Sequence, residues 1–150
     1  MIIFCDTNIV MEFLQQRKNA NEVREILTDS IQKGNELFIS VGSFYTITYL
    51  TERYLKTDLS LTKQDRINRL RYILNGVLGT FKLAGQLSDS LSKGVNDSLF
   101  DDLEDSYQAH IAEDIHCDFL LTINEKHFSQ FAKHSTVRVT TPIEFIEKYL

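Results

Sequence analysis

Acidic, hydroxyl and amide side chains stand at three separated places in this chain, and each group adjoins an apolar segment. The groups are Asp6, Thr7 and Asn8; Asp101, Asp102, Glu104 and Asp105; and Asn124 with Glu125. Carboxylates that gather in one place raise one another's pKa, and a hard divalent cation is the usual remedy near neutral pH. Mg²⁺ and Mn²⁺ prefer such oxygen ligands, activate water and stabilise a phosphate under attack. These residue types therefore indicate metal-assisted hydrolysis of a phosphodiester.

Each group also has a purely structural interpretation. Asp6 could cap a helix, the acids around Asp105 could favour the positive end of a helix dipole, and Asn124 could occupy a turn. The histidines show no metal-ligand spacing, and we expect them at the surface or at helix ends without a catalytic role; they are His110, His116, His127 and His134. The convergence of the acids on one edge of a sheet is what would favour the chemical interpretation.

The composition is typical of a globular protein, with 43% hydrophobic and 25% charged residues among 150. We expect one domain spanning residues 1–150. We also expect a cytoplasmic location, because the N-terminal apolar run is too short to span a membrane and no basic segment precedes it. Cys5 and Cys117 lie among apolar neighbours and are expected to be reduced core residues, and the chain has no Cys-x-x-Cys pair for zinc.

The formal net charge of −5 argues against a general affinity for nucleic acid, which usually shows as an excess of Lys and Arg. A local excess occurs between residues 53 and 71. The basic residues there are Arg53, Lys56, Lys63, Arg66, Arg69 and Arg71. This stretch is either a solvated helix face or a local contact with a nucleic-acid backbone.

Short apolar segments alternate with amphipathic ones along the chain. Strands are expected at 2–5, 36–40, 80–83, 119–122 and 136–140, and helices at 9–16, 20–33, 42–56, 62–78, 87–94, 103–115, 125–131 and 143–150. Thr7 or Asn8 is expected to cap the first helix, and Gly34 with Asn35 to end the second. Strands separated by helices predict an α/β sandwich around a mainly parallel sheet, whose ligands bind at the carboxyl ends of the strands.

Three blocks of the chain resemble the PIN domain family, in particular the small bacterial PIN proteins that include VapC-like ribonuclease toxins. The blocks are MIIFCDTNIVMEFL, FDDLEDSYQAHIAEDIHCDFLLTINEKHF and VRVTTPIEFI. The most specific pattern is D-x-E-D-x-x-Q followed by D-F-L-L-T-x-N. Haloacid-dehalogenase-like phosphatases also begin with an apolar strand and Asp, but they need a second Asp two residues later, where this chain has Asn8. The resemblance implies a three-layer α/β/α sandwich and hydrolysis of RNA with Mg²⁺ or Mn²⁺ held by three or four acids.

The resemblance assigns roles to several residues. The first acid is Asp6, and Asp105 is the acid that opens the long later helix. The accompanying positions are the acids Asp102 and Glu104, Asn124 where many relatives have Asp, and the polar pair Thr7 and Asn8, which orients the first acid or a metal-bound water. One departure stands out, because Thr46 takes the place of the family's second acid. Glu52 lies six residues further along the helix and on another face.

We therefore predict a metal-dependent endoribonuclease that is the toxin of a type II toxin–antitoxin pair. The alternative is a PIN-fold RNA-binding or scaffold protein that has lost catalysis, which the neutral Thr46 and Asn124 favour. The predicted catalytic residues are Asp6, Asp102, Glu104, Asp105 and Asn124, of which Asp6, Asp102 and Asp105 hold the metal. The predicted RNA contacts are Thr7, Asn8, Thr46, Arg53, Arg66 and Arg69. The expected protein partner is a cognate antitoxin bearing Arg or Lys. We also expect a homodimer that pools two acidic sites. The third interpretation of the function is a DNA-directed, structure-specific nuclease.

Overall fold

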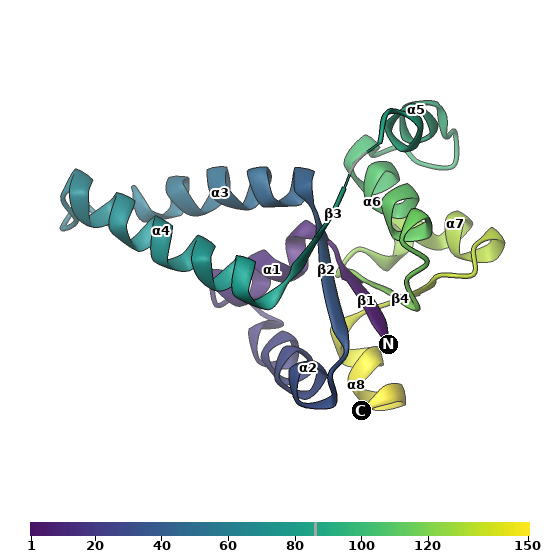
Figure 1. Cartoon of the computed structure of the whole chain (residues 1–150), viewed down its shortest axis with the longest axis horizontal. Coiled ribbons are helices and arrows are strands. Elements are labelled where there is room, and N and C mark those ends of the chain that lie inside the picture. The colour runs from purple at the N-terminus through teal and green to yellow at the C-terminus, as the bar shows by residue number, and fades with distance from the viewer. Residues whose placement is uncertain (86) are drawn as a thin grey trace.

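A five-stranded parallel sheet forms the centre of the computed structural model, which describes residues 1–85 and 87–150 of the chain (Figure 1). The strands are β1 (Ile2–Cys5), β2 (Glu36–Ser40), β3 (Lys82–Ala84), β4 (Phe119–Leu121) and β5 (Arg138–Thr140). Their order across the sheet is β3-β2-β1-β4-β5. The chain first builds outward from β1 through β2 and β3, and then on the other side through β4 and β5. The strand order therefore reverses between β1 and β4, which is where ligands of such sheets bind.

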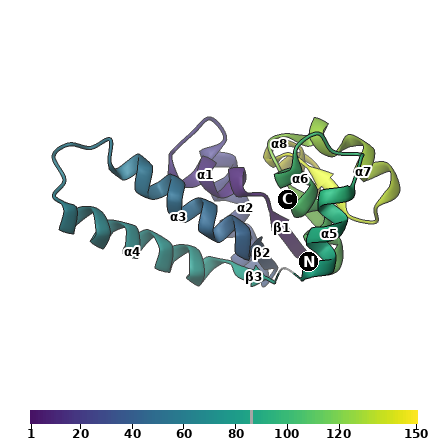
Figure 2. The ribbon, with the colours of Figure 1, turned by 90° about the horizontal axis from the view of Figure 1, so that it is seen from above.

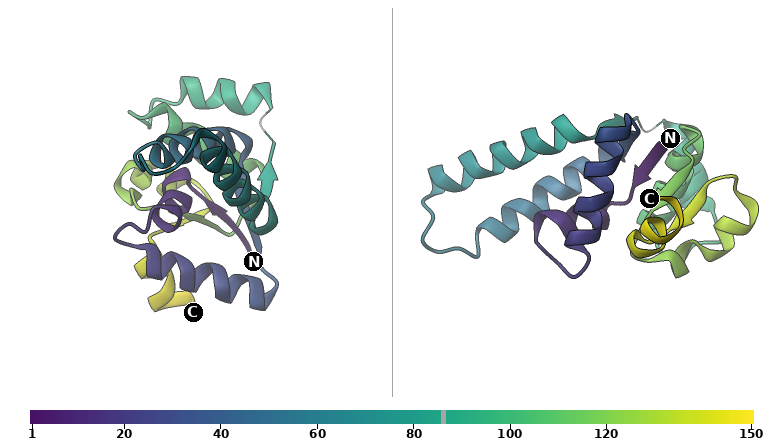
Figure 3. Two further views of the ribbon diagram at one scale, coloured as in Figure 1. Left: turned by 90° about the vertical axis from the view of Figure 1, so that its left-hand side faces the viewer. Right: turned by 90° about the horizontal axis from the view of Figure 1, so that it is seen from below.

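Helices cover both faces of the sheet, as the predicted three-layer α/β/α sandwich requires. Within the described residues they are α1 (Thr7–Leu14), α2 (Ala20–Lys33), α3 (Val41–Leu55), α4 (Lys63–Thr80), α5 (Ser88–Asn96), α6 (Leu103–Asp114), the 3₁₀ helix η1 (Glu125–Phe128), α7 (Ser129–His134) and α8 (Pro142–Tyr149). α1, α2 and α8 lie on one face with parts of α3 and α4, whereas α6, η1 and α7 lie on the other. α2 and α8 run side by side, and α5 packs on α6 (Figure 3).

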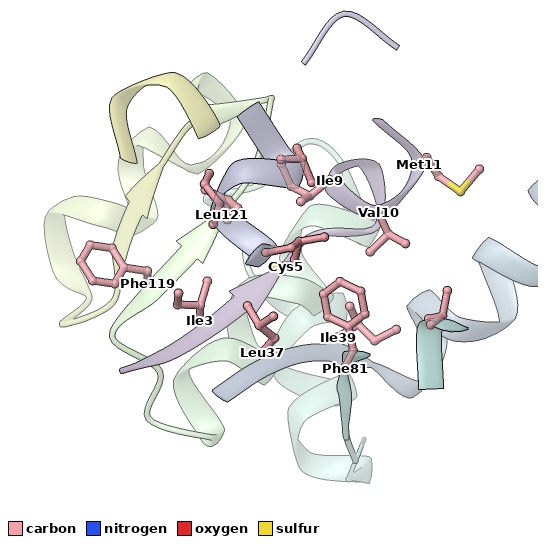
Figure 4. Close-up of a cluster of buried hydrophobic side chains, with 14 of the residues drawn as sticks. Ile3, Cys5, Ile9, Val10, Met11, Leu37, Ile39, Phe81, Phe119 and Leu121 are labelled. Atoms are coloured by element: carbon pink, nitrogen blue, oxygen red, sulfur yellow. The ribbon is translucent and has the colours of Figure 1, made fainter. Parts of the chain in front are cut away.

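The central strand is apolar on both sides because both of its faces are buried. Ile3 and Cys5 point into one hydrophobic cluster, which Figure 4 shows together with side chains of α1 and β2. Phe4 points into the other cluster, beneath α6 and α7. A strand buried on both faces is expected to be continuously apolar rather than alternating. Cys5 and Cys117 are free, buried thiols, as predicted.

α3 and α4 form a long helical hairpin that extends away from the sheet (Figures 1 and 2). α3 begins at the sheet edge, where the Ser40 hydroxyl accepts the backbone N–H of Ser43 over 2.8 Å. α4 begins at a capping box formed by Thr62 and Asp65. Residues 41–80 contain six basic and three acidic residues, so the hairpin region carries a net charge of +3 in a chain of net charge −5.

The predicted elements are present, with shifts at their ends. The third strand begins at Lys82 because α4 continues through Thr80, and the helix predicted at 125–131 is divided into η1 and α7. Gly34 ends α2 as predicted, in the left-handed conformation with φ of 70°. None of the helices in the described part of the chain combines the length and hydropathy that a membrane span requires.

Candidate active site

Asp6 stands at the carboxyl end of the central strand, beside the reversal of strand order. The residue is 2% exposed, and its backbone N–H donates to the Leu121 carbonyl over 3.0 Å, which joins it to the end of β4. The Thr122 hydroxyl donates to Asp6 Oδ2, also over 3.0 Å. Asp6 occupies the N-cap position of α1, but its carboxylate makes no capping hydrogen bond. The expected cap at Thr7 or Asn8 is therefore wrong, and capping does not explain the Asp6 carboxylate.

The pKa of Asp6 is raised to about 7, mainly because the carboxylate is buried. The hydrogen bond from Thr122 lowers this pKa, whereas the charges of Asp105 and Glu104 raise it. Asp6 is far from Glu104 and Asp105 in the sequence, yet the charges of these two acids act on its carboxylate at the edge of the sheet. The convergence that the chemical interpretation requires is thus present for these acids.

Asp105 lies in the first turn of α6 and is 6% exposed. Its Oδ2 is 2.7 Å from Nδ1 of His127, which η1 provides. Burial raises the pKa of Asp105, the hydrogen bond to His127 lowers it, and the charge of Asp102 raises it. The side chain of His127 is 54% exposed, as expected for a surface histidine, but it also orients one of the two buried carboxylates.

The acidic segment before α6 combines capping and site chemistry. Asp102 is the N-cap of α6, and its Oδ1 accepts the backbone N–H groups of Glu104 and Asp105 over 2.8 and 3.3 Å. Glu104 is exposed, and its Oε1 accepts the hydroxyl proton of Thr7 over 3.2 Å. The structural interpretation of this segment therefore applies to Asp102, whereas Asp105 and Glu104 face the charge of Asp6.

Four polar side chains form a buried network next to these acids. The Thr7 and Ser43 hydroxyl oxygens are 2.8 Å apart, and Ser40 donates to Ser43 over 2.9 Å. The Gln108 amide nitrogen lies 2.9 Å from the Ser43 oxygen and 3.3 Å from the Thr7 oxygen. All four residues are nearly inaccessible to solvent. The network joins the starts of α1 and α3 to α6, and thus fixes three elements around the carboxylates.

The remaining predicted site residues lie at the start of η1, on α1 and on the α3–α4 hairpin. Asn124 is half-buried, and its backbone N–H donates over 3.1 Å to the hydroxyl of Thr122, the residue bonded to Asp6. Asn8, in the first turn of α1, is half-buried. Thr46 is also half-buried and lies one helical turn beyond Ser43 on α3. The three predicted RNA-contacting arginines, Arg53, Arg66 and Arg69, belong to the α3–α4 hairpin.

The donor set suits a hard divalent cation that keeps much of its hydration shell. Among residues 1–85 and 87–150, no three His, Cys, Asp or Glu side chains gather closely enough to hold a metal ion alone. Mg²⁺ is commonly bound by one or two carboxylates, with waters and substrate phosphates completing the octahedron. Asp6 and Asp105 supply two buried carboxylates whose pKa values are both raised by burial, and a positive charge nearby would favour their ionised forms. The residues present therefore fit Mg²⁺ or Mn²⁺ held chiefly by this pair.

A hollow of about 370 Å³ opens between the start of α6 and η1. Asp102, Lys126 and His127 are among the residues that line it. Its volume lies in the range of small-molecule sites. Because His127 also contacts Asp105, the hollow lies near that carboxylate and offers space for part of a substrate.

Four residues of the site were given no functional role from the sequence. They are Ser43, Gln108, Thr122 and His127. Thr122 follows β4 as Asp6 follows β1, because Cys5 and Leu121 are paired in the register of the two strands. Gln108 lies one turn after Asp105 on α6, on the same helix face. Register and helical spacing were therefore available signals for these two residues.

A family sequence model and several solved structures are similar to this chain. A sequence model of the PIN domain matches residues 3–126, and no curated protein sequence matches the chain. VapBC2 from Rickettsia felis, bound to a DNA fragment from their promoter, has a similar chain with a TM-score of 0.64 and 16% identity, covering 94% of this chain and 98% of that one. A chain of VapBC-1 from nontypeable Haemophilus influenzae has a TM-score of 0.61 and 13% identity, covering 95% of this chain and 99% of that one. A chain of FitAcB from Neisseria gonorrhoeae has a TM-score of 0.59 and 19% identity, covering 94% of this chain and 98% of that one.

Proposed function

The chain belongs to the PIN domain family, and we propose that it is a divalent-metal-dependent endoribonuclease and the toxin of a type II toxin–antitoxin pair. The observation that carries the proposal is the buried pair Asp6 and Asp105 at the reversal of strand order. A buried carboxylate whose pKa is raised to about 7 is unfavourable for stability alone, and a metal site explains its presence. The PIN domain is a nuclease family, so this chemistry agrees with the family.

The residues of the site have different proposed roles in hydrolysis. Asp6 and Asp105 would hold Mg²⁺ or Mn²⁺, which when bound supplies an activated water and positive charge for the attacked phosphate. Thr122 and His127 each orient one of these carboxylates through a hydrogen bond. Exposed Glu104 adds negative charge beside Asp6. The predicted contributions of Asp102, Asn8 and Asn124 remain proposals, in which they act through water or on the substrate.

A catalytically weakened RNA-binding or scaffold protein is the second candidate. It is favoured by the neutral Thr46, where the family has an acid, and by Asn124. Fewer charges mean weaker cation binding. The two candidates differ in one measurable property, which is cleavage of RNA that depends on both the metal and the buried pair.

The first prediction tests this property with the Asp105→Asn variant. Removing one of two carboxylates is expected to lower Mn²⁺-dependent cleavage of a mixed RNA pool roughly 100-fold or more, because several kcal/mol of charge stabilisation are lost. Asn retains an acceptor for His127, so folding is expected to be preserved. Cleavage is measured on denaturing gels with Mn²⁺ and with a chelator. Activity of Asp105→Asn equal to wild type would indicate a contaminating nuclease and favour the scaffold interpretation.

The second prediction concerns the α3–α4 hairpin as a backbone contact for RNA. Its net charge of +3 contrasts with the net negative charge of the whole chain. Each phosphate contact should contribute to the salt dependence of binding, so Arg53→Ala and Arg69→Ala should each weaken RNA binding and reduce the slope of log K against log salt by about one unit or less. Binding is measured by anisotropy without divalent cation, at several salt concentrations. Arg24→Ala, on α2, is the control, and an equal loss there would refute a specific role for the hairpin.

An antitoxin is the proposed protein partner, and the similarity to VapBC and FitAcB chains supports it. An apolar groove of about 520 Å³ lies between α1, α2 and α4. Phe13, Leu27 and Tyr72 are among the residues that line it. Such a groove suits the apolar face of an amphipathic segment. The homodimer and the cytoplasmic location remain predictions.

A further inference from the structure

We propose that a chain of buried hydroxyl groups holds the Glu104 carboxylate beside Asp6 and thereby strengthens cation binding by the buried acid pair. The positioning residues are Thr7, Ser43 and Gln108. This inference rests on the proposed metal site; it gives Glu104 an electrostatic role beside that site and names the residues that place its carboxylate. Its basis is the direction of the hydrogen bonds in the buried network.

The hydrogen bonds of this network can run in only one direction. A carboxylate accepts protons, so Thr7 must donate its hydroxyl proton to Glu104 over 3.2 Å. The contact of 2.8 Å between Thr7 and Ser43 then requires Ser43 as the donor, since each hydroxyl has one proton. The contact of 2.9 Å between Ser43 and Ser40 in turn requires Ser40 as the donor. Every hydroxyl proton therefore points along the chain toward Glu104.

Gln108 supports this direction with a group that can only donate. Its Nε2 lies against both hydroxyl oxygens, so their remaining lone pairs face the amide. The reverse orientation of the amide would present an oxygen to two hydroxyls whose protons are already used. Gln108 is 3% exposed, and its Oε1 has no hydrogen-bond partner among the described residues, which is unfavourable for a buried acceptor. An apolar side chain would avoid that cost, so the amide is explained by its N–H group.

The hydrogen bond from Thr7 restrains the Glu104 carboxylate, which would otherwise be free to move in solvent. Glu104 is exposed, and a solvated Glu side chain ordinarily samples many rotamers. The bond from Thr7 restrains it on the side of Asp6, whose pKa its charge raises. Thr7 directly follows Asp6 in the chain, so its hydroxyl ties Glu104 to the segment that carries Asp6. In a site where Thr46 is neutral, a restrained Glu104 replaces part of the missing negative charge.

The test is the Mn²⁺ affinity of the whole chain without RNA, measured by titration calorimetry. Thr7→Val and Gln108→Met are expected to weaken Mn²⁺ binding roughly 10-fold or more, as is typical when groups that orient metal ligands are removed. Thr7→Ser, which retains the hydroxyl, should bind like wild type. Thr51→Val is the matched control, because Thr51 is also 3% exposed and its hydroxyl has no hydrogen-bond partner among the described residues. Thermal unfolding without metal should show Gln108→Met at least as stable as wild type.

The Glu104→Gln background shows whether the hydroxyls act through Glu104. There, Thr7→Val should cause no further loss of Mn²⁺ affinity, because the carboxylate that it positions is already gone. An undiminished loss in that background, or wild-type affinity in Thr7→Val, would overturn the positioning role. If Asp6→Asn abolishes Mn²⁺ binding while Thr7→Val does not weaken it, the positioning role alone fails. Wild-type protein that binds no Mn²⁺ would overturn both this role and the proposed function.

Discussion

Replacing Asp6 by asparagine is expected to abolish metal-dependent RNA cleavage and, in the same variant, to stabilise the metal-free protein at neutral pH. Both effects have one origin, which is a carboxylate buried beside other carboxylates. The cation that makes this charge favourable is also what the proposed chemistry needs. Asparagine keeps an oxygen that can accept from Thr122 but removes the charge, so the fold is expected to survive.

The pH dependence of stability follows from the direction of the Asp6 pKa shift. The pKa rises from 3.8 to about 7 on folding, so the folded chain binds more protons than the unfolded chain between those values. The stability that Asp6 contributes is therefore complete below about pH 4 and is lost as the pH rises through 7. At about 1.4 kcal/mol per pH unit, the loss is on the order of 4 kcal/mol. Asp6→Asn removes this dependence, so its advantage over metal-free wild type should grow from pH 5 to pH 8.

Thermal unfolding across this pH range, with a chelator or with Mn²⁺, measures the effect. Wild type should gain stability from Mn²⁺ by mass action, and Asp6→Asn should gain none. Asp118→Asn is the control, because Asp118 is a partly buried acid before β4, at the opposite edge of the sheet, where it accepts the Ile2 N–H over 2.8 Å. It should cleave RNA like wild type. Lower stability of metal-free Asp6→Asn at pH 8 would mean that the carboxylate serves the fold rather than a cation.

The centre of the sheet could be predicted from the sequence because the central strands carry a clear apolar pattern. Ile2–Cys5 and Phe119–Leu121 are apolar on both faces, and helices such as α2 show amphipathic spacing. Parallel strands bring their carboxyl ends to one edge, so the convergence of Asp6 with the acids at the start of α6 followed from topology. The ends of elements were less predictable, since a helix such as α4 continues for as long as packing supports it.

The contacts within the site could not be predicted to the same extent, because they depend on side-chain direction. Asp102 and Asp105 are three residues apart in one acidic segment, yet the first is exposed at a helix cap and the second is buried. His127 resembles any surface histidine in sequence, and only the fold brings η1 against α6. Gln108 was visible as part of a motif, but its two neighbours belong to the starts of α1 and α3. Tertiary contacts of this kind leave no periodic signal.

The Thr46→Glu substitution is expected to increase Mn²⁺ affinity and RNA cleavage roughly 10-fold or more. Thr46 is half-buried one turn after Ser43, whose hydroxyl contacts Thr7. Side chains on a helix lean toward its N-terminus, and the N-terminus of α3 is at the sheet edge beside Asp6. A glutamate here would therefore extend back toward the acids. One added charge near a divalent cation is worth a few kcal/mol at an effective dielectric constant of about 20, before desolvation is subtracted.

The same substitution should lower the stability of the metal-free protein, because a further carboxylate raises the repulsion around Asp6. Opposite effects with and without Mn²⁺ distinguish a completed cation site from a general change in stability. Tyr45→Glu provides the matched control, since Tyr45 precedes Thr46 on α3 but is 71% exposed and directs its charge to solvent. It should leave Mn²⁺ affinity unchanged.

An equal gain of Mn²⁺ affinity in both variants would mean that long-range electrostatics alone explains the effect. No gain in Thr46→Glu would mean that α3 does not face the cation. A selective gain would show that the neutral residue at position 46 is what limits this site, and that its two buried carboxylates already define where the cation binds.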